Sequence, residues 1–555
     1  MSSAKHLLPA PVVFPGDEPF WQAAAQGRLL LKHCPACDRS HFYPRAHCPL
    51  CGHPDTHWRE ASGRGKVYSY TLMGRAARPT APAIVELEEG PRLSTVVVDA
   101  DVHALAIDDP VTLRFLPTEQ GLQALAFTTP AADHARRYTQ AALSELGQAP
   151  SGRAQAMQEA AVIGAGNMGT GIAQAFLSAG LRVLLIDSSA TSLAAGLERI
   201  EQALHKDLER GRLDASAHAA RRALLRTSTS LADVANADVI VEAVFEDMTL
   251  KQQLFAAIDA VAAPHALLAT NTSTLDVGAI AAATSRPGSV LGLHFFNPAH
   301  VMRLIEVVRA PHTSPEAILL AQALAQRLGK VAVVVGICDG FVGNRLMIRR
   351  EREAARLLLE GAWPQHIDRV LRAFGLPMGT FELQDMAGGI ALTYHARKRS
   401  GQSDWLIEQL FERGRTGLRA GKGYYRYEAG KRTPIVDPEV SDLIEQASRA
   451  AGIERRHIDD AEIRDRLILP MVNEGAKLIE EGIVERASDI DLVWQFGYGW
   501  PDWKGGPMYH ADRLGIASVV ERLNALRDAH GERFEPASLL VRLAQTQHGL
   551  TPALP

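Results

Sequence analysis

Apolar and polar positions follow different periods in three successive regions of the chain. Between residues 65 and 128, short segments rich in β-formers are separated by turn residues, which predicts a small all-β barrel or sandwich. From Glu159 to about Cys338, near-continuous apolar runs alternate with longer helical stretches, as in a mainly parallel sheet covered by helices on both faces. After Phe341 the pattern is helical. The chain is therefore expected to contain β, α/β and all-α regions in that order.

The helical region repeats itself. The segment Arg345–Ala362 aligns with Arg466–Ile483. The agreement continues beyond these helices, which makes coincidental amphipathic patterning a poor explanation. The continuing matches pair Ile367-Asp368 with Ile490-Asp491 and Phe374-Gly375 with Phe496-Gly497, and Asp385 is a candidate match for Asp512. Two similar all-α units that pack on each other are the simplest interpretation.

A glycine-rich turn follows the first apolar run of the α/β region. It reads Gly164-Ala-Gly166-Asn167-Met168-Gly169 and opens a helical stretch. In this context the glycines permit a tight turn, a close approach of pyrophosphate and close helix–strand packing. The phosphates would lie at the helix N-terminus. The next apolar run ends in Asp187, whose carboxylate can accept both ribose hydroxyls of NAD and would repel the 2′-phosphate of NADP; a helix cap is the alternative role for Asp187.

Four of the five cysteines are close together near the N-terminus. Cys34, Cys37, Cys48 and Cys51 form two CxxC pairs separated by ten residues, whereas Cys338 stands alone and is expected to be a buried small residue. Such pairs favour a metal site over disulfides. Four thiolates fill a tetrahedral site completely, which suits structural zinc; iron in a rubredoxin-type site is the chemical alternative.

Composition and charge limit the other functions. The 555 residues are 46% hydrophobic and carry a formal net charge of −4, which does not suggest nucleic acid or an anionic membrane as the main partner. No apolar run approaches the ~20 residues of a membrane span, and no secretory signal is recognisable. A cytoplasmic protein is expected.

Further motifs point to a substrate. They are VEAVFEDMTLK (241–251), LATNTSTL (268–275), LGLHFFNPAHVMRLIEVV (291–308) and GFVGNRL (340–346). With these motifs, residues 159–530 resemble the 3-hydroxyacyl-CoA dehydrogenase family, and most of all the dehydrogenase half of multifunctional β-oxidation enzymes. Oxidation of a secondary alcohol by NAD needs a base for the hydroxyl proton, and a histidine suits this task at neutral pH.

The resemblance implies roles for individual residues. His294 is the expected base and Glu306 its orienting carboxylate, while Ser273 and Asn344 are expected at the reacting oxygen or the thioester carbonyl. Taken singly, His294 could be a core histidine and Glu306 a surface residue on a strand. Three further positions match family contacts with NAD, although a turn or a solvated charge would also explain two of them: Glu246, Lys251 and Asn297. The sequence departs from the family at Arg419, where a lysine is frequent, so a cofactor contact there is in doubt.

Residues 15–130 resemble a second family. Its zinc-ribbon/OB-fold proteins accompany thiolases, hydroxymethylglutaryl-CoA synthases and MaoC-type hydratases, which implies acyl-CoA handling or partner docking. Nucleic-acid binding is the alternative for such a module, but its acidic and basic residues nearly balance. One basic stretch could meet CoA phosphates or form a solvated face, and the second interpretation is slightly favoured; its members are Arg59, Arg64, Lys66, Arg75 and Arg78.

These inferences define the expected molecule. The fold class is an N-terminal zinc ribbon plus OB-fold β-barrel, a central Rossmann α/β domain and a C-terminal duplicated all-α domain. The expected boundaries are 1–60 for the helix and ribbon, 61–132 for the barrel, 133–157 for a linker with some helical tendency, 158–338 for the Rossmann domain, and 339–455 and 456–555 for the helical units.

The expected function is NAD-dependent oxidation of a (S)-3-hydroxyacyl-CoA, with structural zinc and a thiolase-like partner or acyl-CoA on the N-terminal module. A scaffold subunit of a thiolase complex, with dehydrogenase activity that depends on the partner, is the alternative. About 150 residues are too few for a crotonase-type hydratase, so no such activity is expected. The resemblance also suggests a homodimer, whereas the acyl chain stays open.

Overall fold

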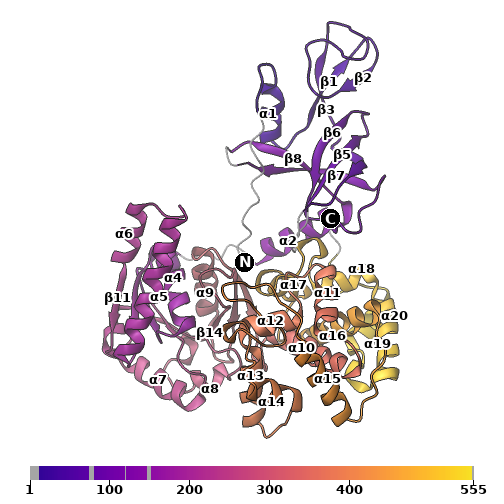
Figure 1. Ribbon diagram of the computed structural model, residues 1–555. Helices are drawn as coiled ribbons and strands as arrows, with labels where there is room; N and C mark the ends of the chain where they lie inside the picture. Colours follow the sequence, from indigo (N-terminus) through magenta and orange to yellow (C-terminus); the bar gives the residue numbers. More distant parts are fainter. Residues whose placement is uncertain (1–11, 74–79, 119–120, 147–151, 553–555) are drawn as a thin grey trace.

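A computed structural model describes residues 12–73, 80–118, 121–146 and 152–552. An N-terminal module stands above a body in which the α/β domain and the helical domain lie side by side (Figure 1). The fold class expected from the sequence is confirmed. Within the described part of the chain, no helix is both long and apolar enough to cross a membrane.

The N-terminal module begins with a helix and a small sheet. Helix α1 (Glu18–Ala25) precedes β1 (Leu30–Cys34), β2 (Arg39–His41) and β3 (His57–Glu60), which pair antiparallel in the order β2-β1-β3. One cysteine pair flanks the β1–β2 turn, and the other lies in the loop between β2 and β3. This short sheet therefore brings the two CxxC turns together.

A closed five-stranded barrel follows. Its strands are β4 (Arg64–Tyr70), β5 (Ala81–Leu87), β6 (Arg92–Val97), β7 (Pro110–Pro117) and β8 (Gln123–Thr128), in the order β4-β5-β6-β8-β7. Side chains on β5 alternate between the barrel interior and the outside, as a period of two requires. Phe20 of α1 joins the interior, so the helix and the barrel share one core.

The segment expected to be a linker contains a packed helix. Helix α2 (Pro130–Glu145) begins at Thr129, whose side chain accepts a hydrogen bond from the Ala132 amide. It buries Ala132, Ala135, Tyr138 and Ala142, and it lies against α17 (Ala487–Gly497) and the 3-10 turn Asp502–Lys504. Three of the four buried side chains are alanines, so this helical face is only weakly apolar in the sequence. A short helix, α3 (Gly152–Ala156), leads into the α/β domain.

The α/β domain is built on one eight-stranded sheet in the order β11-β10-β9-β12-β13-β14-β15-β16. The strands are β9 (Glu159–Ile163), β10 (Arg182–Ile186), β11 (Leu225–Ser228), β12 (Val239–Glu242), β13 (Leu267–Thr270), β14 (Val290–Phe295), β15 (Leu304–Val308) and β16 (Val331–Val335). The β14–β15 pair is antiparallel, and the other neighbours are parallel. The helices are α4 (Asn167–Ser178), α5 (Ala190–Glu209), α6 (Ala215–Ala223), α7 (Met248–Val261), α8 (Val277–Ala281) and α9 (Pro315–Arg327).

The helical domain consists of two units. The first contains α10 (Gly343–Glu360), α11 (Pro364–Phe374), α12 (Thr380–Ala387), α13 (Gly389–Arg399), α14 (Trp405–Glu412) and α15 (Pro438–Ala450). The second contains α16 (Asp460–Glu480), α17, α18 (Pro507–Leu514), α19 (Ile516–His530) and α20 (Ser538–Thr546). Helices α10 and α16 carry the aligned segments of the repeat, and they pack on each other. Both units contribute to one continuous hydrophobic core.

Matching aspartates make matching hydrogen bonds in the two units. Asp368 accepts from the amides of Phe381 and Glu382 at the start of α12, and Asp491 accepts from the amides of Met508 and Tyr509 at the start of α18. Asp385 and Asp512 each accept from two backbone amides as well, close to the ends of their units. The equivalent contacts show that the repeat is structural.

The two aspartates differ in the source of one further hydrogen bond. In the first unit the Tyr425 hydroxyl donates to Asp368 Oδ2 over 2.7 Å. In the second unit the Tyr138 hydroxyl of α2 donates to Asp491 Oδ2, also over 2.7 Å. A residue that precedes the α/β domain thus completes the second helical unit. Helix α2 is therefore an integral part of the body rather than a free connection.

Candidate active site and zinc centre

The turn between β9 and α4 requires its glycines. Gly164 has a φ of +108°, and a Cβ there would lie 2.5 Å from the Ala243 carbonyl oxygen. A Cβ on Gly169 would lie 1.8 Å from the Gly164 carbonyl oxygen. Gly166 is the N-cap of α4 without a side-chain cap, and a Cβ there would meet open space. The amides at the start of α4 are accessible to an anion, which fits the pyrophosphate of a dinucleotide.

The residues around this turn present polar groups. Asp187 follows β10 and accepts hydrogen bonds from the amides of Ala165 and Ser189, both over 2.9 Å. Each carboxylate oxygen keeps a lone pair, so Asp187 can accept ribose hydroxyls. The Asn167 amide donates to Asn297 Oδ1 over 3.0 Å, which joins the glycine turn to the loop after β14. Met168 is half-buried in the first turn of α4.

Glu246 and Lys251 lie in one network, together with an acid that the motifs did not single out. The Lys251 ammonium is 2.6 Å from Glu242 Oε1 and 3.4 Å from Glu246 Oε2, and its side chain is 1% exposed. Glu246 accepts from Thr272 and from the Ser273 amide, which fixes the turn after β13. Hydrogen bonds and the Lys251 charge keep the pKa of Glu246 below its usual value although burial opposes this. Removing one partner of a buried pair such as Glu242–Lys251 costs roughly 3–5 kcal/mol.

The sheet register pairs His294 with Glu306. The two residues are direct partners on the antiparallel strands β14 and β15. Nδ1 of His294 lies 2.6 Å from Glu306 Oε2, and because a carboxylate accepts, Nδ1–H donates; Nε2 is the ring nitrogen that this contact leaves unused. The His294 ring packs 4.4 Å from the ring of Phe296. With His294 6% exposed and Glu306 fully buried, the pair is held away from bulk solvent.

Glu306 also anchors the helix that carries Asn344. Its second oxygen, Oε1, accepts from the amides of Val342 and Gly343 at the start of α10. One buried carboxylate therefore fixes both the histidine ring and the N-terminus of α10. Asn344 is the second residue of this helix. The structure thus brings His294, Glu306 and Asn344 together through hydrogen bonds, and Ser273 lies after the neighbouring strand β13, against Glu246.

Tyr498 is a polar contact of Asn344 that the sequence did not indicate. Its hydroxyl donates to Asn344 Oδ1 over 2.7 Å, which leaves the amide N–H groups of Asn344 free to donate elsewhere. The Tyr498 ring contacts Phe296 and stacks on Trp494. A Cβ on Gly343 would lie 2.4 Å from the Tyr498 ring. Burial and the nearby Glu306 raise the pKa of Tyr498 well above its ordinary value, so it stays a donor.

The four N-terminal cysteines form a compact cluster. Their Sγ atoms all lie within 4.8 Å of one another. The separations are 3.6 Å for Cys34–Cys51 and 3.7 Å for Cys37–Cys48. Zinc–sulfur bonds of about 2.3 Å in a tetrahedron place sulfurs about 3.8 Å apart, so the donors fit a structural zinc ion.

Family comparisons agree with this geometry. Residues 159–338 match the model described as 3-hydroxyacyl-CoA dehydrogenase, NAD binding domain, and residues 340–427 and 463–550 match the C-terminal domain of the same family. The dehydrogenase part of multifunctional enzyme 1 from Caenorhabditis elegans is 30% identical, with a TM-score of 0.54, over 70% of this chain and 89% of that chain. The chain belongs to the 3-hydroxyacyl-CoA dehydrogenase family.

Other relatives belong to the same kind of enzyme. The 3-hydroxybutyryl-CoA dehydrogenase of Escherichia coli K12 is 28% identical, with a TM-score of 0.61, over 70% of this chain and 98% of that chain. The peroxisomal bifunctional enzymes of Danio rerio and Homo sapiens are 39% and 38% identical over 70% of this chain. The chain spans 56% and 57% of the length of these two curated relatives.

The N-terminal module of the chain matches two further models. Residues 21–56 match the ChsH2 rubredoxin-like zinc ribbon domain, and residues 58–116 match the ChsH2 C-terminal OB-fold domain. Of the basic stretch, Arg64 pairs with Glu88, and Lys66 with Asp108. Arg75 and Arg78 lie outside the described residues. These two ion pairs are exposed to solvent, as expected for a solvated face.

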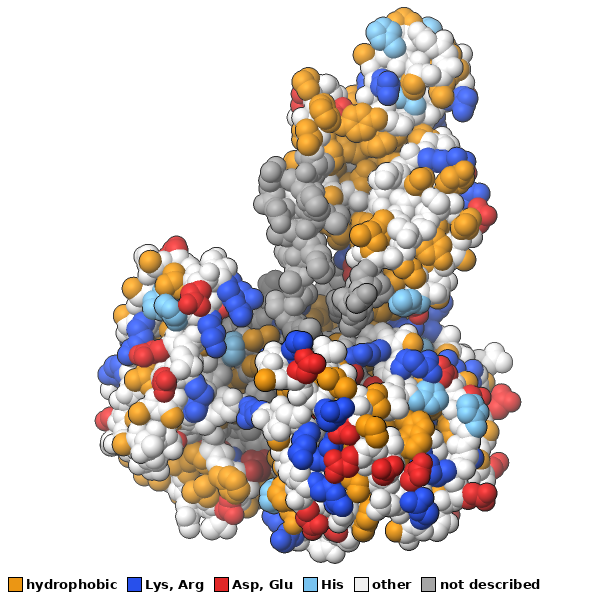
Figure 2. Space-filling view, in the orientation of Figure 1, with side chains coloured by type: hydrophobic (Ala, Val, Ile, Leu, Met, Phe, Trp, Pro, Cys, Tyr) orange, Lys and Arg blue, Asp and Glu red, His pale blue; other side chains and the backbone are white. Residues whose placement is uncertain are grey.

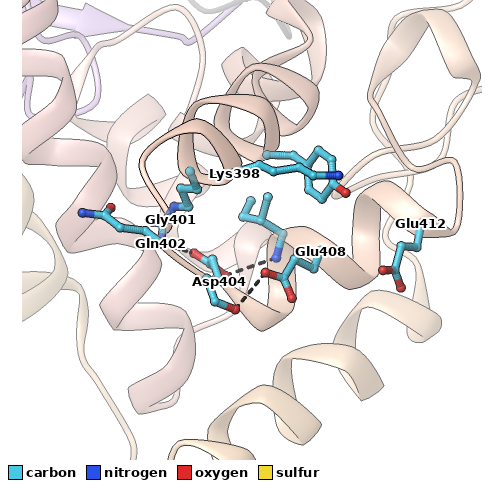
Figure 3. Close-up of a pocket in the computed structure, with 10 residues that line it drawn as sticks. Lys398, Gly401, Gln402, Asp404, Glu408 and Glu412 are labelled. Atoms are coloured by element: carbon cyan, nitrogen blue, oxygen red, sulfur yellow. Dashed lines mark hydrogen bonds and ion pairs between the residues drawn. The ribbon is translucent and has the colours of Figure 1, made fainter.

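A cavity in the first helical unit is separate from these groups. It has a volume of about 280 Å³ and lies between α13 and α14. Lys398 lines it beside the acidic groups of Asp404, Glu408 and Glu412 (Figure 3). None of the site residues expected from the sequence lines it. Arg419 is exposed on the 3-10 turn Leu418–Ala420.

Proposed function

We propose that the chain oxidises (S)-3-hydroxyacyl-CoA to 3-ketoacyl-CoA with NAD. The observation that carries this proposal is the buried His294–Glu306 hydrogen bond, because the same carboxylate fixes the histidine ring and the start of α10, where Asn344 lies, in a chain of the dehydrogenase family. The reaction breaks the C3–H and O–H bonds of the substrate and forms the C3=O double bond. The C3–H electron pair leaves with its hydrogen as hydride, and the hydroxyl hydrogen leaves as a proton.

His294 is the proposed base. Its Nε2 accepts the hydroxyl proton. Nδ1–H remains hydrogen-bonded to Glu306, and this buried carboxylate stabilises the imidazolium that forms. NAD supplies the hydride acceptor when bound. Asn344 and Ser273 are proposed donors to the reacting oxygen or the thioester carbonyl. The Tyr498 hydroxyl binds the oxygen of the Asn344 side-chain amide, so the N–H groups of that amide point to the other side.

NAD is proposed to bind across the β9–α4 turn. Gly164, Gly166 and Gly169 shape the turn, with Asn167 and Met168 between them, and Asp187 accepts the ribose hydroxyls. Glu246 and Asn297 are two further proposed cofactor contacts. Since Lys251 is enclosed by carboxylates, we assign it the task of holding Glu246. The four cysteines are proposed to hold zinc that stabilises the ribbon.

The N-terminal module is proposed to dock a thiolase-like partner that consumes the ketoacyl-CoA. Apolar side chains gather on the surface of this module (Figure 2). Phe14, Tyr43, Leu50, Tyr68 and Leu72 are each at least 41% exposed, which is costly for a surface that stays in water. Mixing the purified chain with such a thiolase should give a complex in light scattering. A module that binds acyl-CoA itself would instead respond to the thioester alone.

Three coarser features complete the proposal. We propose a homodimer, which the mass of the purified chain in solution tests. We propose a cytoplasmic location, because four unpaired thiols in a metal site persist in a reducing compartment. The domain boundaries are proposed as expected from the sequence, except that 130–145 belongs with the second helical unit because of the Tyr138–Asp491 contact.

Formation of NADH tests the proposed reaction. We expect an absorbance increase with NAD and (S)-3-hydroxyacyl-CoA, little with the (R) epimer, and much less with NADP because of Asp187. His294→Gln should lower kcat about a hundred- to ten-thousand-fold and retain NADH binding. A His294→Gln variant with wild-type kcat would contradict the mechanism. Activity that appears only after addition of a thiolase would favour the scaffold alternative.

A further inference from the structure

A buried lysine lies at the edge of the sheet where the candidate site is built. Lys330 directly precedes β16, which runs parallel to β15, while β15 is antiparallel to β14. The start of β16 therefore lies at the same edge as the carboxyl end of β14, which carries His294. Lys330 is 7% exposed, and within the described part of the chain its ammonium forms no ion pair with a carboxylate. A buried cation of this kind needs other hydrogen-bond acceptors.

Two backbone carbonyls accept hydrogen bonds from this ammonium. Lys330 Nζ donates to the Ala299 oxygen over 2.7 Å and to the Met302 oxygen over 2.5 Å. Both carbonyls belong to the loop 296–303, which connects β14 to β15. The ammonium also lies 5.9 Å from the centroid of the Phe295 ring, at the end of β14. The lysine thus fastens the middle of this loop to the start of β16.

The loop 296–303 contacts both parts of the candidate site. The centroid of the Phe296 ring lies 4.4 Å from that of His294, the proposed base. Asn297 Oδ1 accepts a hydrogen bond from the Asn167 amide, in the glycine turn, over 3.0 Å. A shift of this loop would therefore disturb the surroundings of the base and of the cofactor turn together.

The order of the sheet indicates which half of the cofactor this loop meets. Asp187, the proposed acceptor of the adenosine ribose, follows β10, and the glycine turn follows β9. Strands β12, β13 and β14 lie on the other side of β9 from β10. A dinucleotide that crosses the glycine turn therefore extends its nicotinamide half toward the carboxyl ends of these strands, where Ser273 and Asn297 lie.

We propose that Lys330 is a positioning residue for NAD, whose ammonium holds the loop 296–303 in the conformation that receives the nicotinamide half. The inference rests on the proposed function and adds to it a residue that acts through the loop. Two charge-assisted hydrogen bonds restrict the loop before the cofactor arrives. Without them the loop would occupy the receptive conformation for only a fraction of the time, which weakens cofactor binding by the same factor.

The test measures NADH binding and steady-state kinetics on the purified full-length chain. Lys330→Met keeps the length of the side chain and removes its charge and its donors. We expect the Kd for NADH, followed by NADH fluorescence, and the KM for NAD to rise about fivefold or more. The kcat at saturating NAD should stay within about threefold of wild type, because bound cofactor restores the loop. Lys330→Arg keeps the charge and the donors, so its Kd should lie between those of the wild type and Lys330→Met.

Arg455→Met is the matched control, because the Arg455 guanidinium also donates to backbone carbonyls, those of Leu358 and Ala362 in the helical domain. It should lower the thermal midpoint and leave the Kd for NADH within about twofold of wild type. An unchanged Kd in Lys330→Met, or an equal rise in Arg455→Met, would overturn the inference. If Lys330→Met does not fold, Lys330→Gln takes its place with the same expected rise.

Failure of the proposed function gives a different result. The Kd for NADH is measured without acyl-CoA, so it reports on Lys330 whether or not the chain oxidises a thioester. A wild type that binds NADH but oxidises no 3-hydroxyacyl-CoA would refute the proposed reaction, and the Kd values of the variants would still decide the role of Lys330.

Discussion

At the scale of single residues, a few polar side chains organise the candidate site. Glu306 connects the His294 ring to the start of α10, and Tyr498 holds the amide of Asn344. His294, Glu306 and Asn344 became candidates because the motifs that contain them resemble those of a known family. These motifs were not enough to select Tyr498, which lies 154 residues beyond Asn344 and becomes its neighbour only because the second helical unit folds back on α10.

Loss of the Tyr498 hydroxyl should slow the reaction. Tyr498→Phe removes one hydrogen bond to Asn344, worth about 1 kcal/mol, so kcat should fall roughly fivefold. The KM for NAD should stay within about twofold of wild type because Tyr498 is not a proposed cofactor contact. Steady-state kinetics measures both parameters. Tyr425→Phe is a matched control, since it removes a buried hydroxyl from Asp368 and should leave kcat near wild type. Equal kcat losses in both variants would reduce Tyr498 to a general stability role.

At the scale of elements, the repeat and α2 show what the pattern could and could not reveal. Matching helices and matching Asp368 and Asp491 were visible because aligned segments keep their order. The packing of α2 was not visible, because its buried face is mostly alanine and Tyr138 gives a single strong signal. Helix packing depends on the partner surface as well as on the helix itself, so a weakly apolar face cannot be assigned from sequence.

The contact between α2 and the second unit should matter for stability. Tyr138→Phe leaves the buried Asp491 with one donor fewer and should lower the free energy of unfolding by about 1–3 kcal/mol. Tyr425→Phe should cause a loss of similar size, because Asp368 accepts an equivalent hydroxyl. Urea unfolding monitored by tryptophan fluorescence measures both. A Tyr138→Phe variant as stable as wild type would mean that α2 is held by its apolar contacts alone.

His510 on α18 should make the helical domain sensitive to acid. Burial, first of all, lowers its pKa to about 4, from an ordinary value near 6.5, and its ring contacts Phe374 and Trp500. Between pH 4 and 6.5 the unfolded chain binds this proton and the folded chain does not, so stability rises with pH across this window. The thermal midpoint of the wild type should fall by several degrees between pH 6.5 and 4.5. The thermal midpoint of His510→Phe should fall less over the same pH range, and a fall equal to that of the wild type would contradict this role of His510.

At the scale of the whole molecule, two bodies with separate cores are joined by α2. The ribbon and barrel share one hydrophobic core, and the sheet and helical units have their own. This division was visible in the sequence because the period of the apolar pattern changes between regions. The contact between the barrel and the second helical unit, which includes Lys504 beside Asp101, was not visible, since no local pattern encodes it.

Zinc removal should therefore affect the two bodies differently. Displacing the metal with a thiol reagent should release about one zinc per chain and melt the ribbon, because structural zinc supplies much of the folding free energy of such domains. The kcat for hydroxyacyl-CoA oxidation should stay within about twofold, since the proposed catalytic groups lie in the other body. A zinc dye and the NADH assay follow both events. Cys338→Ser is the control and should release the same amount of zinc as the wild type. Loss of activity together with zinc would contradict the expected independence of the two bodies.

The central claim is that hydride moves from C3 of the acyl chain to NAD while His294 takes the hydroxyl proton. The most direct measurement uses (S)-3-hydroxyacyl-CoA deuterated at C3 and NMR of the NADH that forms. The account predicts one deuterium at the nicotinamide C4 position of each NADH, a 3-ketoacyl-CoA product, and loss of both with His294→Gln. NADH without deuterium, or labelled NADH at the wild-type rate from His294→Gln, would contradict it.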